Sequence, residues 1–226
     1  MQLNNFVKAI LLIMFGVLFG VVSSYFTFKN SSVNQIINKE EKVYIQENTA
    51  LTNAIKNIKS SIVGIKSGNK INGSGVIVTS DGLIVTLAEN VPLGLESNIS
   101  IDAEDNITYQ VLKRDLANNL ALIKVEKNNL STRSFFDLSK IEEGMRVFIL
   151  SKSFNYSAVK FFFSANEGIV KSFNEEIIKT NIVETGRVEG SPVFDIEGNI
   201  LGLAYKDVNN FINIIPVSKI KSFAGL

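Results

Sequence analysis

Residues 183–205 read "VETGRVEGSPVFDIEGNILGLAY", and the order of loop, strand, turn and strand within them points to a β fold. The first half is a glycine-rich loop. The second half is a hairpin, with apolar runs at 192–194 and 200–203 joined by a turn at 197–199. Glycine-rich loops bring backbone close to another group. The tip of this loop carries a carboxylate, Glu189, between Val188 and Gly190, so Glu189 is the first candidate functional residue.

Short β runs separated by turns fill the chain from residue 62 onward. They are 62–66, 75–79, 83–86, 99–102, 108–113, 120–125, 146–150, 159–163, 168–171, 177–182, 193–194, 200–204 and 212–215. A polar break at 127–144 divides them into two groups. This pattern predicts an all-β domain of two packed barrels or sandwiches, at about 51–126 and 144–226, without a strong internal helix. We expect the run of Phe161, Phe162 and Phe163 to be a strand buried on both faces.

Composition excludes several functional classes. The net charge is +1, and the segment "GNKINGSG" (68–75) lacks the Gly-Lys-Ser/Thr ending of a phosphate-binding loop and precedes a strand. We therefore expect no nucleic-acid or nucleotide ligand. The chain has no cysteine, which excludes disulfides, thiolate zinc sites and a cysteine nucleophile. It also has no histidine, the side chain that most often acts as a catalytic base near neutral pH.

The N-terminus is apolar and long enough to span a membrane. Residues 9–28, "AILLIMFGVLFGVVSSYFTF", carry no charge and lie between Lys8 and Lys29. We expect an uncleaved single-pass anchor within residues 1–28, and the alternative is a signal peptide cleaved near residues 22–24. The positive-inside rule places the C-terminal domain outside the cytoplasm. Residues 29–50 are polar and are expected to form a partly helical juxtamembrane linker.

Three blocks of the sequence resemble the signature blocks of the HtrA/Deg branch of trypsin-like serine proteases. They are "NGSGVIVTSDGLIVTLAENV" (72–91), "RDLANNLALIKV" (114–125) and "IIKTNIVETGRVEGSPVFDIEGNILGL" (177–203). Further similar segments follow the family order, so the resemblance covers about residues 51–226. It implies a chymotrypsin-like fold of two β-barrels, with the active site in the cleft between them.

The resemblance also implies which residues stand at the catalytic positions. The place of the general-base histidine holds Glu89, that of the orienting aspartate holds Asn119, and that of the nucleophilic serine holds Glu189. The oxyanion loop is changed as well. Arg187 replaces the glycine two positions before the nucleophile, and the Gly-Gly pair after it has become Gly190 and Ser191.

These replacements predict that the protease mechanism is lost. A serine becomes nucleophilic only with a base within hydrogen-bond reach, and the chain has no histidine to supply one. Asn90, one residue beyond Glu89, is no substitute, and Ser191 is held just before Pro192. Glu89 and Glu189 could instead form a carboxylate pair with new chemistry. No metal-ligand spacing surrounds them, and Arg187 is close enough in sequence to neutralise one, so we expect no metal and no cofactor.

The function expected from the sequence is therefore that of a membrane-anchored, catalytically inactive relative of the HtrA proteases that binds a peptide or protein partner. Such binding can use backbone hydrogen bonds at a strand edge. The resemblance ends with the second barrel, so we expect no PDZ domain. The alternatives are residual or non-standard hydrolysis through Glu89 and Glu189, and a structural role in a membrane assembly. Family analogy also suggests a homotrimer.

Overall fold

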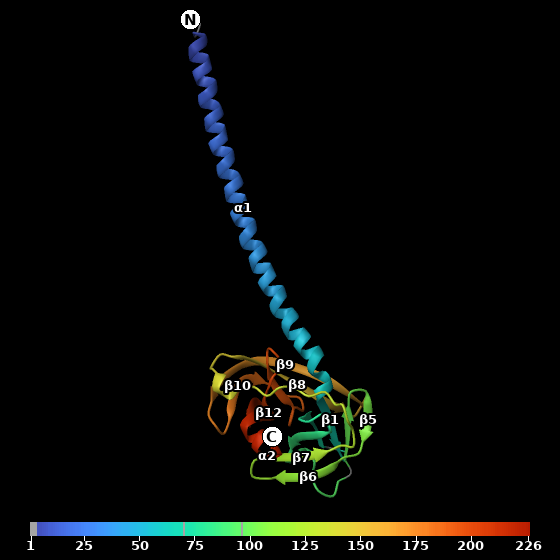
Figure 1. The fold of residues 1–226 in the computed structure, drawn as a ribbon. Helices are drawn as coiled ribbons and strands as arrows, with labels where there is room; N and C mark the ends of the chain where they lie inside the picture. Colours follow the sequence, from blue (N-terminus) through green and yellow to red (C-terminus); the bar gives the residue numbers. More distant parts are fainter. Residues whose placement is uncertain (1–3, 70, 96) are drawn as a thin grey trace. The chain divides into compact units, whose positions relative to one another are not determined.

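The computed structural model describes residues 4–69, 71–95 and 97–226, with the backbone alone for residues 5–6, 11 and 27–48. The chain divides into two compact units, Met1–Thr49 and Ala50–Leu226, and Figure 1 shows the second unit as the β domain. The candidate functional residues all lie in this second unit.

Helix α1 spans Asn5–Ile58. Its segment Val7–Phe26 has a mean hydropathy of 2.3, and within the described part of the chain it is the one helical segment apolar and long enough to cross a membrane. The N-terminal apolar helix expected from the sequence is therefore present. A signal sequence has the same length and composition, so the choice between anchor and signal peptide stays a prediction. The backbone is also helical through residues 29–50.

The first half of the domain is an open, antiparallel, seven-stranded sheet with the order β5-β4-β1-β2-β3-β7-β6. The strands are β1 (Ile62–Ser67), β2 (Ile71–Ile77), β3 (Leu83–Leu87), β4 (Ser97–Ile101), β5 (Glu104–Ile107), β6 (Gln110–Asp115) and β7 (Leu120–Lys124). Two short 3₁₀ helices, η1 (Lys59–Ser61) and η2 (Ala88–Asn90), precede β1 and follow β3. Because η2 comes directly after a central strand, its position is fixed by the sheet.

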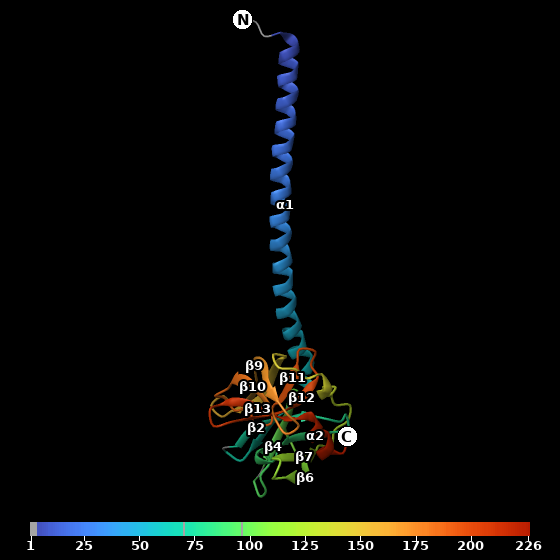
Figure 2. The same cartoon turned by 90° about the vertical axis from the view of Figure 1, so that its left-hand side faces the viewer.

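The second half is a closed six-stranded barrel with the order β10-β13-β12-β11-β8-β9. Its strands are β8 (Arg146–Asn155), β9 (Lys160–Phe173), β10 (Ile178–Val183), β11 (Pro192–Asp195), β12 (Ile200–Lys206) and β13 (Phe211–Pro216). The 3₁₀ helix η3 (Leu138–Lys140) precedes the barrel and helix α2 (Val217–Ala224) follows it. Figure 2 shows β9 to β13 on one side of the domain and β4, β6 and β7 on the other. The double-barrel fold class is confirmed, although the first barrel is open.

Three apolar clusters hold the domain together. One fills the first sheet and includes Ile65 and Ile123, and one fills the closed barrel and includes Val170 and Ile214. The third lies at the junction, where residues of the first sheet such as Leu87 pack with Phe148 and Phe194 of the barrel. The rings of Phe148 and Phe194 stack with their centroids 5.5 Å apart. Because this junction is itself a buried core, the two halves hold the residues between them in fixed positions.

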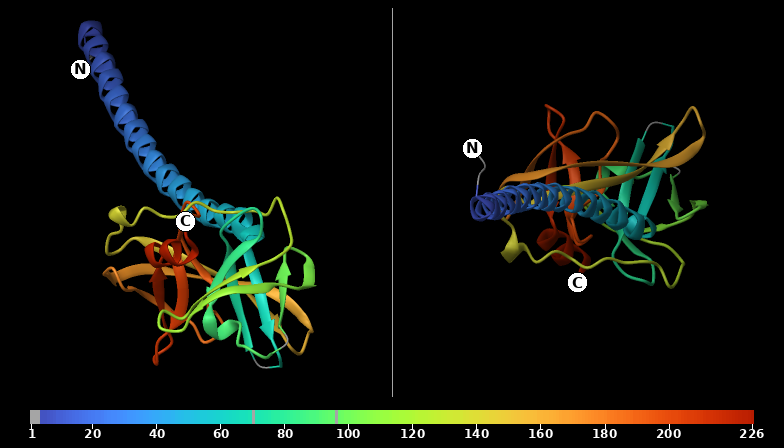
Figure 3. Two further views of the ribbon diagram at one scale, coloured as in Figure 1. Left: turned by 60° about the horizontal axis from the view of Figure 1, so that its bottom comes forward. Right: turned by 90° about the horizontal axis from the view of Figure 1, so that it is seen from above.

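Strand β9 differs from the sequence prediction in two ways. The runs predicted at 159–163 and 168–171 form one strand, which pairs with β8 from Asn155 opposite Lys160 to Arg146 opposite Ile169 and extends beside the first sheet in Figure 3. The expectation that the phenylalanine run is buried on both faces is wrong. Phe161 packs over Gly64, where an added Cβ would lie 2.4 Å from its ring, whereas Phe162 points to the other face and is 43% exposed.

Candidate functional site

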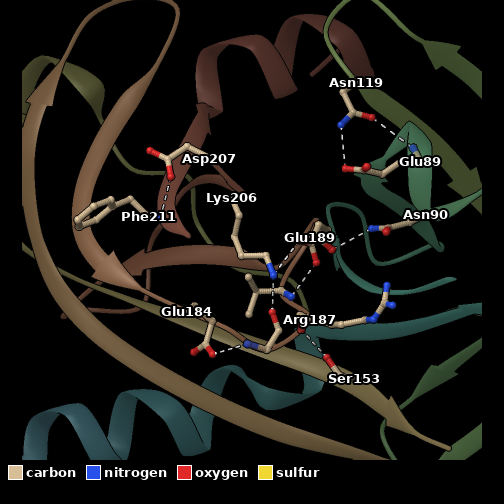
Figure 4. Close-up of polar contacts among 12 residues, drawn as sticks. Glu89, Asn90, Asn119, Ser153, Glu184, Arg187, Glu189, Lys206, Asp207 and Phe211 are labelled. Carbon is tan, nitrogen blue, oxygen red and sulfur yellow. Dashed lines mark hydrogen bonds and ion pairs between the residues drawn. The ribbon is translucent and has the colours of Figure 1, made fainter. Parts of the chain in front are cut away.

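Glu89 and Asn119 lie in direct contact, although 30 positions separate them in sequence. Glu89 is on η2 after β3, and Asn119 lies just before β7 in a left-handed conformation (φ 52°) that asparagine tolerates. The Asn119 side-chain amide donates to Glu89 Oε1 at 3.0 Å, and its Oδ1 accepts from the Glu89 backbone amide at 3.2 Å. Figure 4 shows this reciprocal pair. Two positions implied by the family resemblance therefore meet at one corner of the first sheet.

Asn90 connects this corner to the loop that carries Glu189. Its side chain is buried, and its Nδ2 donates to the Glu189 carbonyl at 2.9 Å and to Thr86 Oγ1 at 3.0 Å. The Ser74 backbone amide donates to the same carbonyl at 3.0 Å. Sequence reasoning considered Asn90 only as a failed substitute for a catalytic base. The structure gives it a positioning role, because it fixes the backbone of Glu189 against the first sheet.

The Glu189 side chain is held by its own half of the domain. Oε1 lies 3.3 Å from Lys206 Nζ, and Oε2 accepts from the Val188 amide at 3.0 Å. Lys206, at the end of β12, also donates to the Gly186 carbonyl at 2.7 Å. Figure 4 shows the Lys206 side chain directed toward Glu189. The two side chains are 24% and 18% exposed, so the ion pair is largely withdrawn from solvent. Lys206 therefore ties the loop 186–189 to β12.

Sequence reasoning missed Lys206 and offered Arg187 as the cation that could neutralise a carboxylate. That expectation is wrong. The Arg187 carbonyl accepts from Ser153 Oγ at 2.7 Å, and the residue is exposed. Figure 4 shows its guanidinium group directed away from the pair of Glu189 and Lys206. The only sequence signal for Lys206 is its position as the first charged residue after the apolar run 200–205, which does not identify its partner.

The residues after Glu189 are packed tightly and already hydrogen-bonded. Gly190 has φ 77°, and an added Cβ would lie 2.4 Å from the Ser74 carbonyl oxygen. Its amide donates to the Ala204 carbonyl at 2.8 Å. Ser191 is fully buried, and its Oγ has no hydrogen-bond partner among the described residues. A substrate carbonyl outside the domain therefore has no path to the Ser191 hydroxyl.

The chemistry available at these positions is limited. Glu89 is paired with the Asn119 amide, and Glu189 with the Lys206 ammonium group. The two carboxylates thus have different partners, one a neutral amide and the other a cation.

Two cavities border the strands and loops that carry the candidate residues. One, of about 700 Å³, borders the loop 184–187 and the adjoining ends of β8 and β9. A second, of about 910 Å³, lies among β6, β10 and α2, where Lys113, Ile178 and Phe223 line it. None of the residues implied at the catalytic positions lines the second cavity. The first cavity contains Arg187 and is the one adjacent to the candidate site.

Comparison with known proteins shows similarity to trypsin-like peptidase domains. A family model described as a trypsin-like peptidase domain matches residues 73–203. A probable periplasmic serine endoprotease DegP-like of Halomonas elongata is 24% identical over 139 residues, which cover 58% of this chain and 28% of that protein. A protein of the same description from Bartonella henselae is 26% identical over 140 residues, which cover 58% of this chain and 27% of that protein. The chain thus spans less than a third of the length of these relatives.

The solved structures show the same fold. The crystal structure of Deg5 matches with a TM-score of 0.65 at 20% sequence identity, over 78% of this chain and 92% of that chain. The match covers nearly all of the Deg5 chain.

Proposed function

We propose that this chain, which belongs to the trypsin-like peptidase domain family, has lost peptide cleavage and acts as a membrane-anchored domain that binds peptides or proteins. The signature blocks of the chain and its similarity to DegP-like proteins and to Deg5 indicate the fold of an HtrA/Deg-type serine endopeptidase.

The observation that carries the proposal is the state of the nucleophile position. It holds Glu189, whose carboxylate is engaged by Lys206 and by the Val188 amide. The sequence contains no histidine to act as a base, and the nearby hydroxyl of Ser191 is buried. Acyl transfer by this family's mechanism needs a nucleophile, a base and free oxyanion donors together. This arrangement supports a non-catalytic role.

Peptide binding needs none of these groups. Extended peptides bind through backbone hydrogen bonds and through pockets for alternate side chains. The domain retains two packed sheets and a cavity of about 700 Å³ beside the loop 184–187. These features support binding in the former substrate cleft.

Membrane attachment with the domain outside the cytoplasm is the second part of the proposal. The segment Val7–Phe26 supports it by its length and hydropathy. Relatives described as periplasmic support the placement of the domain.

The test is incubation of the full chain, purified in detergent, with unfolded casein. We expect no more casein fragments than with a heat-denatured sample of the same preparation, while trypsin under the same conditions gives complete cleavage. Time-dependent fragments that depend on the native protein, and that persist after repeated purification, would overturn the proposal.

A further inference from the structure

We propose that the cavity beside Arg187 binds an acidic side chain of an extended peptide, with the Arg187 guanidinium group as its counter-ion. This inference rests on the proposed function, because it names the peptide chemistry that the same cleft would select. It depends on chain-specific residues, since Arg187 stands where the resembling family has glycine.

The cavity has a volume of about 700 Å³ and lies between the β8–β9 hairpin, the start of β2 and the loop 184–187. Its lining combines aromatic, amide and charged side chains, including Asn72, Phe154, Tyr156, Phe162, Glu184 and Arg187. A volume of this size accommodates an amino-acid side chain together with its neighbours in a peptide.

Arg187 is available to a ligand. Arg187 is exposed, and its side chain makes no hydrogen bond or ion pair with any of the described residues. The two nearest carboxylates in sequence are committed to other groups. Glu189 pairs with Lys206, and Glu184 accepts from the Gly186 amide at 2.9 Å and from the Asn166 side chain at 3.3 Å. A carboxylate from outside the chain would therefore meet a guanidinium group that has no internal partner.

A second cation reinforces the positive charge. Lys66 Nζ lies 4.5 Å from the ring centroid of Phe154 and 5.7 Å from that of Tyr156. Arg187 and Tyr156 line the same cavity, and the positive charge of Arg187 opposes the rise that burial gives to the pKa of the Tyr156 hydroxyl. Two cations thus flank one aromatic pair, whose own rings meet edge to face at 5.1 Å. These two cations favour an anion, whereas the Glu184 carboxylate, which also lines the cavity, opposes one, so the preference depends on direct contact with Arg187.

The backbone of the loop favours a contact through the arginine side chain. The amides of Gly186 and Val188 already donate to the carboxylates of Glu184 and Glu189, so they do not form an anion-binding nest for a peptide terminus. A guanidinium group binds a carboxylate through two parallel hydrogen bonds. Phe162, which is 43% exposed in the same cavity, offers an apolar surface to a neighbouring peptide side chain. The ligand is therefore an acidic residue beside an apolar one.

The test compares two pools of fluorescein-labelled, C-terminally amidated peptides. One position is fixed as Glu in the first pool and as Gln in the second, and the flanking positions are randomised over apolar and small polar residues. In fluorescence anisotropy with the detergent-purified full chain, the Glu pool should bind at least about tenfold more tightly than the Gln pool. A third pool, with Gln at the fixed position and a free C-terminal carboxylate, should bind like the amidated Gln pool.

Variants identify the cation. Arg187→Gln should bring the Glu pool down to the affinity of the Gln pool, and Arg187→Glu should reverse the preference toward a pool with Lys at the fixed position. The matched control is Lys160→Gln, which removes one charge from the same β8–β9 ribbon outside the cavity lining and should leave the preference unchanged.

The outcomes separate the two proposals. Equal binding of the Glu and Gln pools, unaffected by Arg187→Gln, would overturn the acidic specificity while leaving peptide binding intact. Tighter binding of the free C-terminal pool would assign the site to a chain terminus and also overturn the inference. Failure of every pool to bind would count against peptide binding itself.

Discussion

The Glu189 carboxylate is stabilised by contacts that no single segment of the sequence contains. It sits on a loop between β10 and β11, yet its ionic partner, Lys206, ends β12. A half-buried carboxylate without such a partner carries a desolvation cost. The pair with Lys206 therefore explains how a glutamate is accommodated where the resembling family has a serine.

We predict that Lys206→Met destabilises the domain by about 1–3 kcal/mol, because it leaves the carboxylate of Glu189 largely buried without its cation. The measurement is thermal unfolding followed by circular dichroism. The control is Lys140→Met. Lys140 forms an ion pair with Asp137, and the two side chains are 75% and 59% exposed. We therefore expect Lys140→Met to change the free energy of unfolding by no more than about 0.5 kcal/mol. Adding Glu189→Gln to Lys206→Met should recover part of the loss, and equal effects of Lys206→Met and Lys140→Met would refute this explanation.

At this scale the sequence predicts some of the site and misses the rest. Glu89 and Asn119 could be assigned because each lies at a fixed offset within a gapless signature block. In the structure their side chains are in direct contact. Lys206 could not be assigned, because its contact with Glu189 depends on how β12 passes the loop in three dimensions. The contact of the Arg187 carbonyl with Ser153 likewise joins residues 34 positions apart.

The loop 186–190 is seated on β2 and η2 through very close backbone contacts. Gly190 has no room for a side chain, since a Cβ would meet Ser74 O at 2.4 Å and Asn90 Nδ2 at 2.6 Å. This close approach, with the hydrogen bonds to the Glu189 carbonyl, joins the closed barrel to the open sheet at the candidate site.

Alanine at Gly190 should therefore be far more damaging than alanine at Gly94. Both glycines have a positive φ, 77° and 79°, but nothing lies within 4 Å of a Cβ at Gly94. We expect Gly94→Ala to cost about 1 kcal/mol from backbone strain alone, and Gly190→Ala to cost at least about 2 kcal/mol more because of the clash. Thermal unfolding measures both. Similar losses for the two variants would show that the loop is not tightly seated.

Strand β8 carries a buried lysine toward the β4–β5 turn. Lys152 is 2% exposed, and its Nζ donates to the Asp102 carbonyl at 2.8 Å. Burial lowers the pKa of Lys152 from 10.5 to about 8, and the charges of Asp105 and Asp102 oppose this. In the folded state the lysine thus loses its proton at a lower pH than in the unfolded chain. Its contribution to stability is greatest above pH 10.5 and is lost as the pH falls through 8.

We predict that the free energy of unfolding of the wild type, measured relative to Lys152→Met, rises between pH 8 and pH 10.5. The shift of the pKa corresponds to about 3 kcal/mol, of which about 2 kcal/mol is expected after solvent screening. Chemical denaturation at several pH values tests this. A difference between the two proteins that does not change with pH would contradict the burial of the charged group.

The observed helices and strands show which features of the sequence were sufficient to predict an element. Apolar runs bounded by turns predicted most strands to within a few residues, such as 83–86 for β3 and 177–182 for β10. Strand β5 was missed because three of its four residues are exposed and polar. Helix α2 was missed because it has eight residues and begins after Pro216 without a side-chain cap. The stretch between the two predicted runs, 164–167, was interpreted as a break between strands. It belongs to β9 because the pairing of β9 with β8 continues through it without interruption.

The whole chain combines a candidate membrane segment with a domain of trypsin-like fold, whose catalytic positions we infer to be altered. Its junction core, which includes Ile58 at the end of α1, is independent of the catalytic residues. A fold whose apolar core does not include the active-site residues can lose catalysis and keep a binding surface. This separation is why we propose binding in place of cleavage.

Attachment of the full chain to membranes is a prediction at this scale. In cell fractions we expect the protein to stay with the membranes after high-salt and alkaline carbonate washes, at its full 24.9 kDa, because the apolar segment Val7–Phe26 is long enough to span the bilayer. Intact mass after detergent extraction checks this. Release into the wash as a species shortened at its N-terminus would instead identify a cleaved signal peptide.

Reaction with a fluorophosphonate probe tests the loss of catalysis most directly, because the probe labels only an activated serine. The full chain in detergent is treated with the probe and its intact mass is measured, with trypsin as the positive control. We predict no adduct on the native chain, since the nucleophile position holds Glu189 and the Ser191 hydroxyl is buried. A stoichiometric adduct that heat denaturation prevents, and that Ser191→Ala abolishes, would contradict the account.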